Sequence, residues 1–212
     1  MKKINFNKDW SFRLNEGEET KISLPHDFSI IQKRLPDAKS NQHGGFFQGG
    51  LGEYKKTFKA KKNKKYFFMC DGSFGLTEIY VNYNSVFINK YPYNTFYVDI
   101  TDFLRYDKEN LITVVVNNRH QPNARWYTGA GIYRDTYLLE CGNTYFSPLG
   151  IFVKTDSIQN DTAYLTVSTG SGATSRNLLH RSKMWNLKSS KTILFFSKRL
   201  SSEKEESLFY LQ

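Results

Sequence analysis

The chain has 212 residues, a length that fits one full domain and a remnant of a second. Apolar residues make up 39% and aromatic residues 16%, which excludes a disordered chain and predicts a packed core. The formal net charge is +10, but after residue 170 eight Lys or Arg stand against three Asp or Glu and supply five of those ten charges. This uneven distribution weighs against a nucleic-acid-binding surface on the main body of the chain.

Short apolar runs of strand length recur between Gly52 and Glu140, each rich in β-branched or aromatic residues and bounded by Gly, Asn, Asp or Lys. No segment in this span keeps an apolar period of about 3.6 residues, so we expect an antiparallel all-β sandwich or jelly roll. The lysines at 59–65 are interpreted as a solvated hairpin turn between the first two runs. The predicted strands are Tyr54–Phe58, Tyr66–Cys70, Ile79–Val81, Val86–Ile88, Phe96–Ile100, Leu111–Val116 and Tyr133–Leu139.

Two further strands are predicted after Cys141, at Phe146–Thr155 and Ala163–Ser168. They would open a second β domain, but an immunoglobulin-like sandwich needs about 100 residues, so this domain is expected to be incomplete. Beyond about residue 170 the sequence becomes rich in Ser and Lys and predicts no confident element.

The sequence indicates a cytoplasmic location and no membrane partner. The first ten residues lack the apolar core of a signal peptide, and no stretch is long enough to span a membrane. Cys70 and Cys141 form neither a CxxC motif nor a secreted disulfide pattern. We therefore expect two free, buried thiols in a reducing compartment.

No motif for catalysis, metal or cofactor binding stands out. The four histidines lack metal-ligand spacing, and no nucleophile motif is present. Gly-rich residues 44–52 precede a predicted strand and fit turns with positive φ better than a phosphate site. We interpret the acidic residues at strand ends as turn-closing residues, namely Asp71, Glu78, Asp99, Asp102 and Asp135. The sequence therefore predicts no catalytic residue, no metal and no cofactor.

The most informative stretch is the irregular loop that follows Leu111–Val116. From Asn117 to Asp135 it is dense in amides, guanidinium groups and aromatic rings, which can donate to sugar hydroxyls and stack on the apolar face of a sugar ring. Physical chemistry alone favours a ligand-facing loop and a loop tied down by its own side chains equally.

Residues 125–135 read Arg-Trp-Tyr-Thr-Gly-Ala-Gly-Ile-Tyr-Arg-Asp, and this segment closely resembles one found in family 2 glycoside hydrolases, most closely of β-galactosidase type. The resemblance covers about residues 3–168. Other marks of the family stand in the same order, at Phe6–Trp10, Leu24–Phe28, Gly52–Phe58, Asp71–Gly72, Ile79–Asn82, Pro92–Tyr93, Phe96 and Asp99–Thr101.

The resemblance implies three segments. Residues 1–142 would form a galactose-binding-like jelly roll, the sugar-binding domain of the family, and residues 143–170 would begin an immunoglobulin-like sandwich. In the family a (β/α)8 barrel then supplies the catalytic glutamates, and no trace of it stands in this sequence. Residues 171–212 form an atypical basic tail, interpreted as frameshifted or disordered. We therefore expect a truncated, non-catalytic portion of a β-galactosidase-like enzyme that is inactive alone.

The resemblance also suggests sugar-binding residues. Family members carry an Asp at the rim of the active site just ahead of the Trp-Tyr segment, and Asn117 is its counterpart here, which keeps a hydrogen-bonding oxygen but loses the charge. Arg125 and Trp126 match the family pattern, either as sugar contacts or as anchors of the loop. The expected partner is a β-galactoside or related glycoside.

Self-association, or association with a separate catalytic fragment, is expected because a missing barrel would leave apolar surface exposed. Two alternatives remain open at this stage, a stand-alone carbohydrate-binding module and a basic nucleic-acid-binding β protein. The sequence leaves the identity of the sugar and the oligomeric state open.

Overall fold

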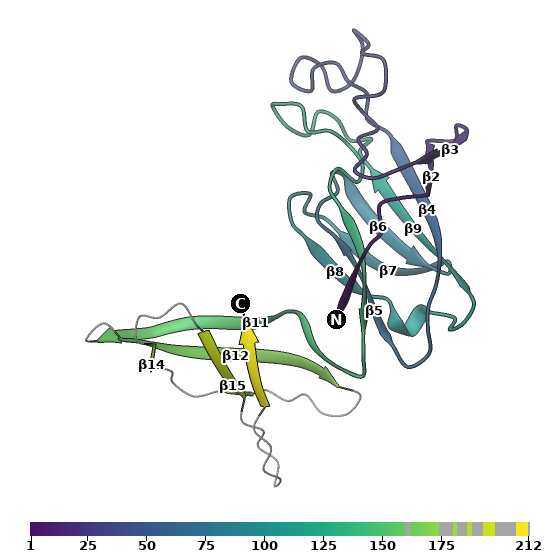
Figure 1. The fold of residues 1–212 in the computed structure, drawn as a ribbon. Coiled ribbons are helices and arrows are strands. Elements are labelled where there is room, and N and C mark those ends of the chain that lie inside the picture. The colour runs from purple at the N-terminus through teal and green to yellow at the C-terminus, as the bar shows by residue number, and fades with distance from the viewer. Residues whose placement is uncertain (160–161, 174–179, 182–185, 188–192, 198–206, 212) are drawn as a thin grey trace. The chain divides into compact units, whose positions relative to one another are not determined.

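The computed structural model describes residues 1–159, 162–173, 180–181, 186–187, 193–197 and 207–211 (Figure 1). The chain divides into two compact units, Met1–Gly142 and Asn143–Gln212. Both units are built from antiparallel strands, so the expected all-β fold class is confirmed.

The first unit is a sandwich of two antiparallel sheets. One sheet has four strands in the order β1-β10-β5-β8, which are Lys2–Asn5, Thr136–Cys141, Lys65–Cys70 and Phe96–Asp99. The other has six in the order β3-β2-β4-β9-β6-β7, which are Glu19–Ile22, Trp10–Leu14, Leu51–Lys59, Glu109–Asn117, Leu76–Val81 and Asn84–Asn89. A short 3-10 helix, Thr101–Phe103, follows β8.

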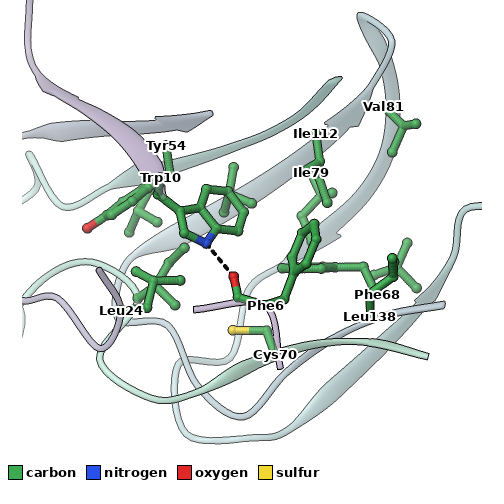
Figure 2. Close-up of a cluster of buried hydrophobic side chains, with 14 of the residues drawn as sticks. Phe6, Trp10, Leu24, Tyr54, Phe68, Cys70, Ile79, Val81, Ile112 and Leu138 are labelled. Atoms are coloured by element: carbon green, nitrogen blue, oxygen red, sulfur yellow. Dashed lines mark hydrogen bonds between the residues drawn. The ribbon is translucent and has the colours of Figure 1, made fainter. Parts of the chain in front are cut away.

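The core lies between the two sheets, because alternate residues on each strand point inward. In β9 the inward residues are Ile112, Val114 and Val116, all buried. Figure 2 shows how aromatic rings from both sheets meet around Trp10, which is fully buried. Its indole Nε1 donates a 2.7 Å hydrogen bond to the Phe6 carbonyl, so the one polar atom of this large side chain is satisfied inside the core.

The seven strands predicted in residues 52–140 all occur, and both cysteines are free and buried as expected. The lysine-rich turn was interpreted wrongly. Residues 60–64 connect β4 to β5, which belong to different sheets, so the turn crosses between layers and closes no hairpin. Strands β1, β2 and β3 were not predicted. Two of them, β1 and β3, are short, polar edge strands with little hydrophobic pattern.

The second unit contains a long antiparallel pair, β11 (Thr144–Gln159) and β12 (Thr162–Ala173), with register shifts between Phe146 and Ile151 and between Thr155 and Ser157. The described parts of the expected tail are strands, β13 (His180–Arg181) and β14 (Asn186–Leu187) on β12, and β15 (Ile193–Ser197) paired with β16 (Ser207–Leu211). The rest of the tail, which we interpreted as frameshifted or disordered, lies outside the described residues.

Replacing Trp10 tests this account of the core. Trp10→Ala should lower the free energy of unfolding by about 3–5 kcal/mol, because it leaves a large cavity. Trp10→Phe should cost about 1–3 kcal/mol, because the Phe6 carbonyl loses its donor. Urea unfolding followed by circular dichroism measures both, with Trp126→Phe at an exposed site as the control. Equal midpoints for Trp10→Phe and the wild type would contradict the role of the indole hydrogen bond.

Candidate functional site

Two long loops leave the same end of the first unit (Figure 1). The 23–50 loop connects β3 to β4, and the 118–135 loop connects β9 to β10. They are joined by a short backbone ladder, in which the His26 and Phe28 amides donate to the carbonyls of Ile132 and Ala130 at 2.7 and 2.8 Å. Neither residue 26 nor residue 28 lies in a strand, so the other loop supplies the acceptors for these two backbone amides.

The carboxylate of Asp27 lies at the centre of this junction. Its Oδ1 accepts hydrogen bonds from the amides of Ser29 and Ala130, both at 2.9 Å. Its Oδ2 accepts the hydroxyl of Tyr127 at 2.7 Å. Burial, with a smaller contribution from Asp27, raises the pKa of Tyr127 above its ordinary value, so this hydroxyl remains a donor at physiological pH. The Asp27 side chain thus stabilises the 23–50 loop and holds the 118–135 loop at Tyr127 and Ala130.

Glycines let the loops approach this closely. A Cβ at Gly129 would lie 2.6 Å from Asp27 Oδ2, and a Cβ at Gly131 would lie 2.3 Å from the hydroxyl of Tyr54. Both glycines also have positive φ, +70° and +113°, which other residues rarely adopt. The Gly-Ala-Gly part of the sequence motif is therefore explained by packing and backbone conformation.

His26 connects the junction to the core. Its Nδ1 is hydrogen-bonded to the hydroxyl of the fully buried Tyr54 at 3.1 Å, and its ring packs edge-on against Phe12. Burial lowers the pKa of His26 below the ordinary value of 6.5, and the neighbouring charge of Asp27 opposes this shift. The folded protein therefore favours neutral imidazole at this position.

The amino-terminal part of the 118–135 loop is anchored by Asn118. Its amide nitrogen donates to the Gly50 carbonyl at 2.8 Å, and its side chain donates to the Gly129 carbonyl at 3.3 Å and accepts from Asn123 at 2.7 Å. Asn118 is buried, so these bonds close the loop on itself.

The three residues predicted to bind sugar lie at different points of the loop. Asn117 ends β9, is half-buried, and accepts the Arg119 amide at 3.1 Å through Oδ1. Arg125 and Trp126 are exposed, and neither side chain makes a hydrogen bond or ring contact with any described residue. Asn118, Asp27 and Tyr127, not Arg125 or Trp126, tie the loop down.

A cleft of about 360 Å³ opens between the two loops. Arg119 and Gln121, which follow Asn117, line one side, and none of the three predicted residues lines it. The remaining lining residues are Asn15, Leu35, Asp37, Ala38, Lys39, Gln48, Gly49 and Gly50.

Two of the acidic residues at strand ends, Asp99 and Asp135, accept hydrogen bonds that stabilise the fold. Asp135 accepts from the Asn7 side chain and the Tyr137 hydroxyl, and Asp99 accepts from the Thr101 amide. Among the described residues, no group of three His, Cys, Asp or Glu side chains is placed to hold a metal ion. No helix in the same residues has the length and apolar character needed to cross a membrane.

Comparison with known proteins places this two-sheet sandwich and its loops among β-glycosidases. A curated β-galactosidase of Bacteroides ovatus is 34% identical over 179 residues, which cover 78% of this chain and 21% of that protein. A solved glycosyl hydrolase family 2 member from Bacteroides cellulosilyticus superimposes with a TM-score of 0.70 at 34% identity, over 81% of this chain and 24% of that one. A β-glycosidase from Bacteroides vulgatus gives a TM-score of 0.76 at 28% identity, over 82% and 25%.

The chain is homologous to a part of these glycoside hydrolase family 2 proteins. It spans about a fifth of the length of the curated relatives that it matches. Those relatives include β-glucuronidases as well as β-galactosidases. No family-level sequence model matches the chain.

The sequence alone does not reveal the role of Asp27. The only local signal is the Asp-Phe-Ser spacing, which favours an Asp side chain that accepts the amide two residues later, as Asp27 does from Ser29. Its other partners, Tyr127 and Ala130, lie 100 and 103 residues away, and no local pattern predicts them.

Removing the Asp27 carboxylate should loosen the 118–135 loop. In Asp27→Ala the Ala130 and Ser29 amides and the Tyr127 hydroxyl lose their acceptor, and we expect a loss of about 2–3 kcal/mol of stability. Hydrogen exchange should show a faster Ala130 amide, while the Val114 amide in the sheet changes only with global stability. Tyr127→Phe, which removes one of the three bonds, is the matched milder variant. Unchanged protection at Ala130 in Asp27→Ala would refute this assignment.

The lowered pKa of His26 predicts a pH effect. As the pH falls through about 6.5, the unfolded chain takes up a proton on His26 that the folded chain resists, so stability should decrease from pH 7.5 to pH 5.5. His26→Gln should flatten this part of the profile, because the amide does not titrate. Thermal unfolding across this range is the measurement, and His43→Gln at an exposed position is the control. A profile that stays equally steep in His26→Gln would rule out His26 as the cause.

Proposed function

We propose that this chain is the non-catalytic, sugar-binding portion of a β-galactosidase-like glycoside hydrolase, and that Asn117, Arg125 and Trp126 contact the sugar. The observation that carries the proposal is the exposure of the Trp126 ring. Its side chain is 62% exposed, although the backbone around it is held by Asn118 and Asp27. A large aromatic ring presented to solvent from an anchored loop has the properties of a ligand contact, because little conformational entropy is lost on binding.

The neighbouring groups suit a sugar hydroxyl. Arg125 is exposed and has planar donors that make no hydrogen bond or ion pair with any described residue. Asn117 uses its oxygen for the Arg119 amide, and its side-chain amide donors make no hydrogen bond with the described residues. An exposed aromatic ring, guanidinium donors and amide donors, which this loop carries at different points, are groups that can contact a sugar.

The domain assignment is part of this proposal. Residues 1–142 would form a galactose-binding-like jelly roll, residues 143–170 would begin an immunoglobulin-like sandwich, and 171–212 would be an atypical basic tail. The resemblance assigns hydrolysis to glutamates of a barrel that this sequence does not span. The chain alone should therefore bind a β-galactoside or a related glycoside without cleaving it.

Association is proposed for the second unit. Large apolar residues exposed on β11 favour association with a second copy of this chain or with a separately made catalytic fragment. These residues are Phe146, Leu149, Ile151, Phe152, Val153 and Ile158. We place the protein in the cytoplasm because both cysteines are unpaired. Burial raises the pKa of the Cys70 thiol to about 12, which suits a structural and unreactive cysteine.

Calorimetric titration of the 212-residue chain with methyl β-galactoside and methyl β-glucuronide tests the function. We expect saturable binding without hydrolysis, about tenfold weaker in Trp126→Ala, which corresponds to about 1.4 kcal/mol. Asn117→Asp restores the acidic residue of the family and should keep binding. Tyr83→Ala, which removes an exposed ring on the β6–β7 turn, is the control.

Three outcomes would contradict the proposal. Absence of saturable binding, equal loss in Trp126→Ala and Tyr83→Ala, or hydrolysis by the chain alone would each do so. Binding of an oligonucleotide that disappears between about 50 and 200 mM salt, without competition by glycoside, would favour the nucleic-acid alternative.

A further inference from the structure

A second group of aromatic side chains lies at the other end of the 118–135 loop. Tyr91 and Tyr93 come from the segment between β7 and β8 and are 61% and 49% exposed. Their ring centroids are 5.9 Å apart with an interplanar angle of 74°, and Tyr93 packs edge-on against Phe74 at 5.6 Å. We call this pair of nearly perpendicular exposed rings the Tyr91–Tyr93 corner.

The backbone of the corner is fixed. Asn89 holds Tyr91 on both sides, because its side-chain nitrogen donates to the Tyr91 carbonyl at 2.8 Å and its oxygen accepts the Tyr91 amide at 3.4 Å. The hydroxyl of Tyr133 donates to the Pro92 carbonyl at 3.0 Å. The corner is therefore tied to the same loop that carries Trp126.

The underside of the corner is equally constrained. A Cβ at Gly72 would lie 2.9 Å from the ring and hydroxyl of Tyr133, so Tyr133 sits directly on the backbone of the turn after β5. The guanidinium of Arg134 lies 5.5 Å from the centre of the Tyr133 ring. Phe74, which supports Tyr93, also exchanges two backbone hydrogen bonds with Gly131, at 2.8 and 3.1 Å.

The exposure of these rings is explained poorly by folding, since Tyr91 is 61% exposed and Tyr93 is 49% exposed, and exposed area contributes little to the core. They fit ligand binding better, because two rings at 74° offer one face for stacking and one edge or hydroxyl for a polar contact. Arg134 adds exposed donors next to Tyr133, whose hydroxyl binds the Pro92 carbonyl of the corner. This combination of apolar face, hydroxyl and cation matches a pyranose ring.

We infer that the Tyr91–Tyr93 corner is a second sugar-binding surface, which holds a sugar residue of a β-linked oligosaccharide independently of Trp126. The inference rests on the proposed carbohydrate function for the kind of ligand, but its residues are separate. Trp126 and Tyr133 are seven positions apart on one loop, a span of at most about 25 Å in an extended chain. A single oligosaccharide that contacts both surfaces would gain affinity from the second one.

The experiment is a calorimetric titration of the 212-residue chain with a β-linked galacto-oligosaccharide and with methyl β-galactoside. In Tyr91→Ala we expect oligosaccharide binding about threefold to tenfold weaker, with retention in Tyr91→Phe, which keeps the ring. Tyr83→Ala is the matched control, because Tyr83 is 82% exposed and makes no ring contact with a described residue. Circular dichroism of each variant checks that the fold is intact.

The two proposals fail in different ways. If Trp126→Ala weakens binding and Tyr91→Ala matches the wild type, the corner is not a sugar surface and the proposed function stands. If only Tyr91→Ala weakens binding, the corner stands and the role of Trp126 falls. A change of oligomeric state in Tyr91→Ala without a change in sugar affinity, or binding of a single-stranded oligonucleotide that Tyr91→Ala abolishes, would overturn the inference in favour of another partner.

Discussion

The order of the loop end of the first unit depends on one carboxylate. The sandwich supplies a rigid base, and the 23–50 and 118–135 loops extend beyond it and are joined to each other by backbone hydrogen bonds. Asp27 accepts from Ser29 in its own loop and from Tyr127 and Ala130 in the other, and an ionised acceptor makes such bonds stronger than a neutral one. The surrounding glycines and the ladder at His26 and Phe28 follow from this close approach.

Anchoring and exposure are separated along the 118–135 loop. Asn118 and Ala130 are buried and bonded near its two ends, whereas Arg125 and Trp126 between them face solvent. A ligand meeting such a loop encounters side chains whose backbone is already ordered, so less of the interaction energy is lost to ordering. The Tyr91–Tyr93 corner repeats the arrangement, with backbone restraints below and open rings above.

Sequence patterns predicted much of the fold and only part of the site. Strands such as β9, where Ile112, Val114 and Val116 alternate with less buried residues, carry a period of two that is readable locally. The edge strands β1 and β3 lack that signal and depend on pairing with distant strands. The motif around Trp126 located the loop, but the partners of Asp27 are set by tertiary contact. The lysines at 59–65 looked like a hairpin turn because composition alone does not reveal which sheet the next strand joins.

Positions in the 118–135 loop differ in how well they should tolerate substitution, and Gly129 and Gly131 are the most restricted. Any side chain at Gly129 or Gly131 collides with Asp27 or Tyr54 and must adopt an unfavourable φ, so substitutions there endanger folding. The side chains of residues 125 and 126, a few positions away, make no hydrogen bond, ion pair or ring contact with the described residues. Substitution at residues 125 and 126 can therefore change the exposed surface of the loop while the hydrogen bonds of Asn118 and Asp27 keep its backbone in place.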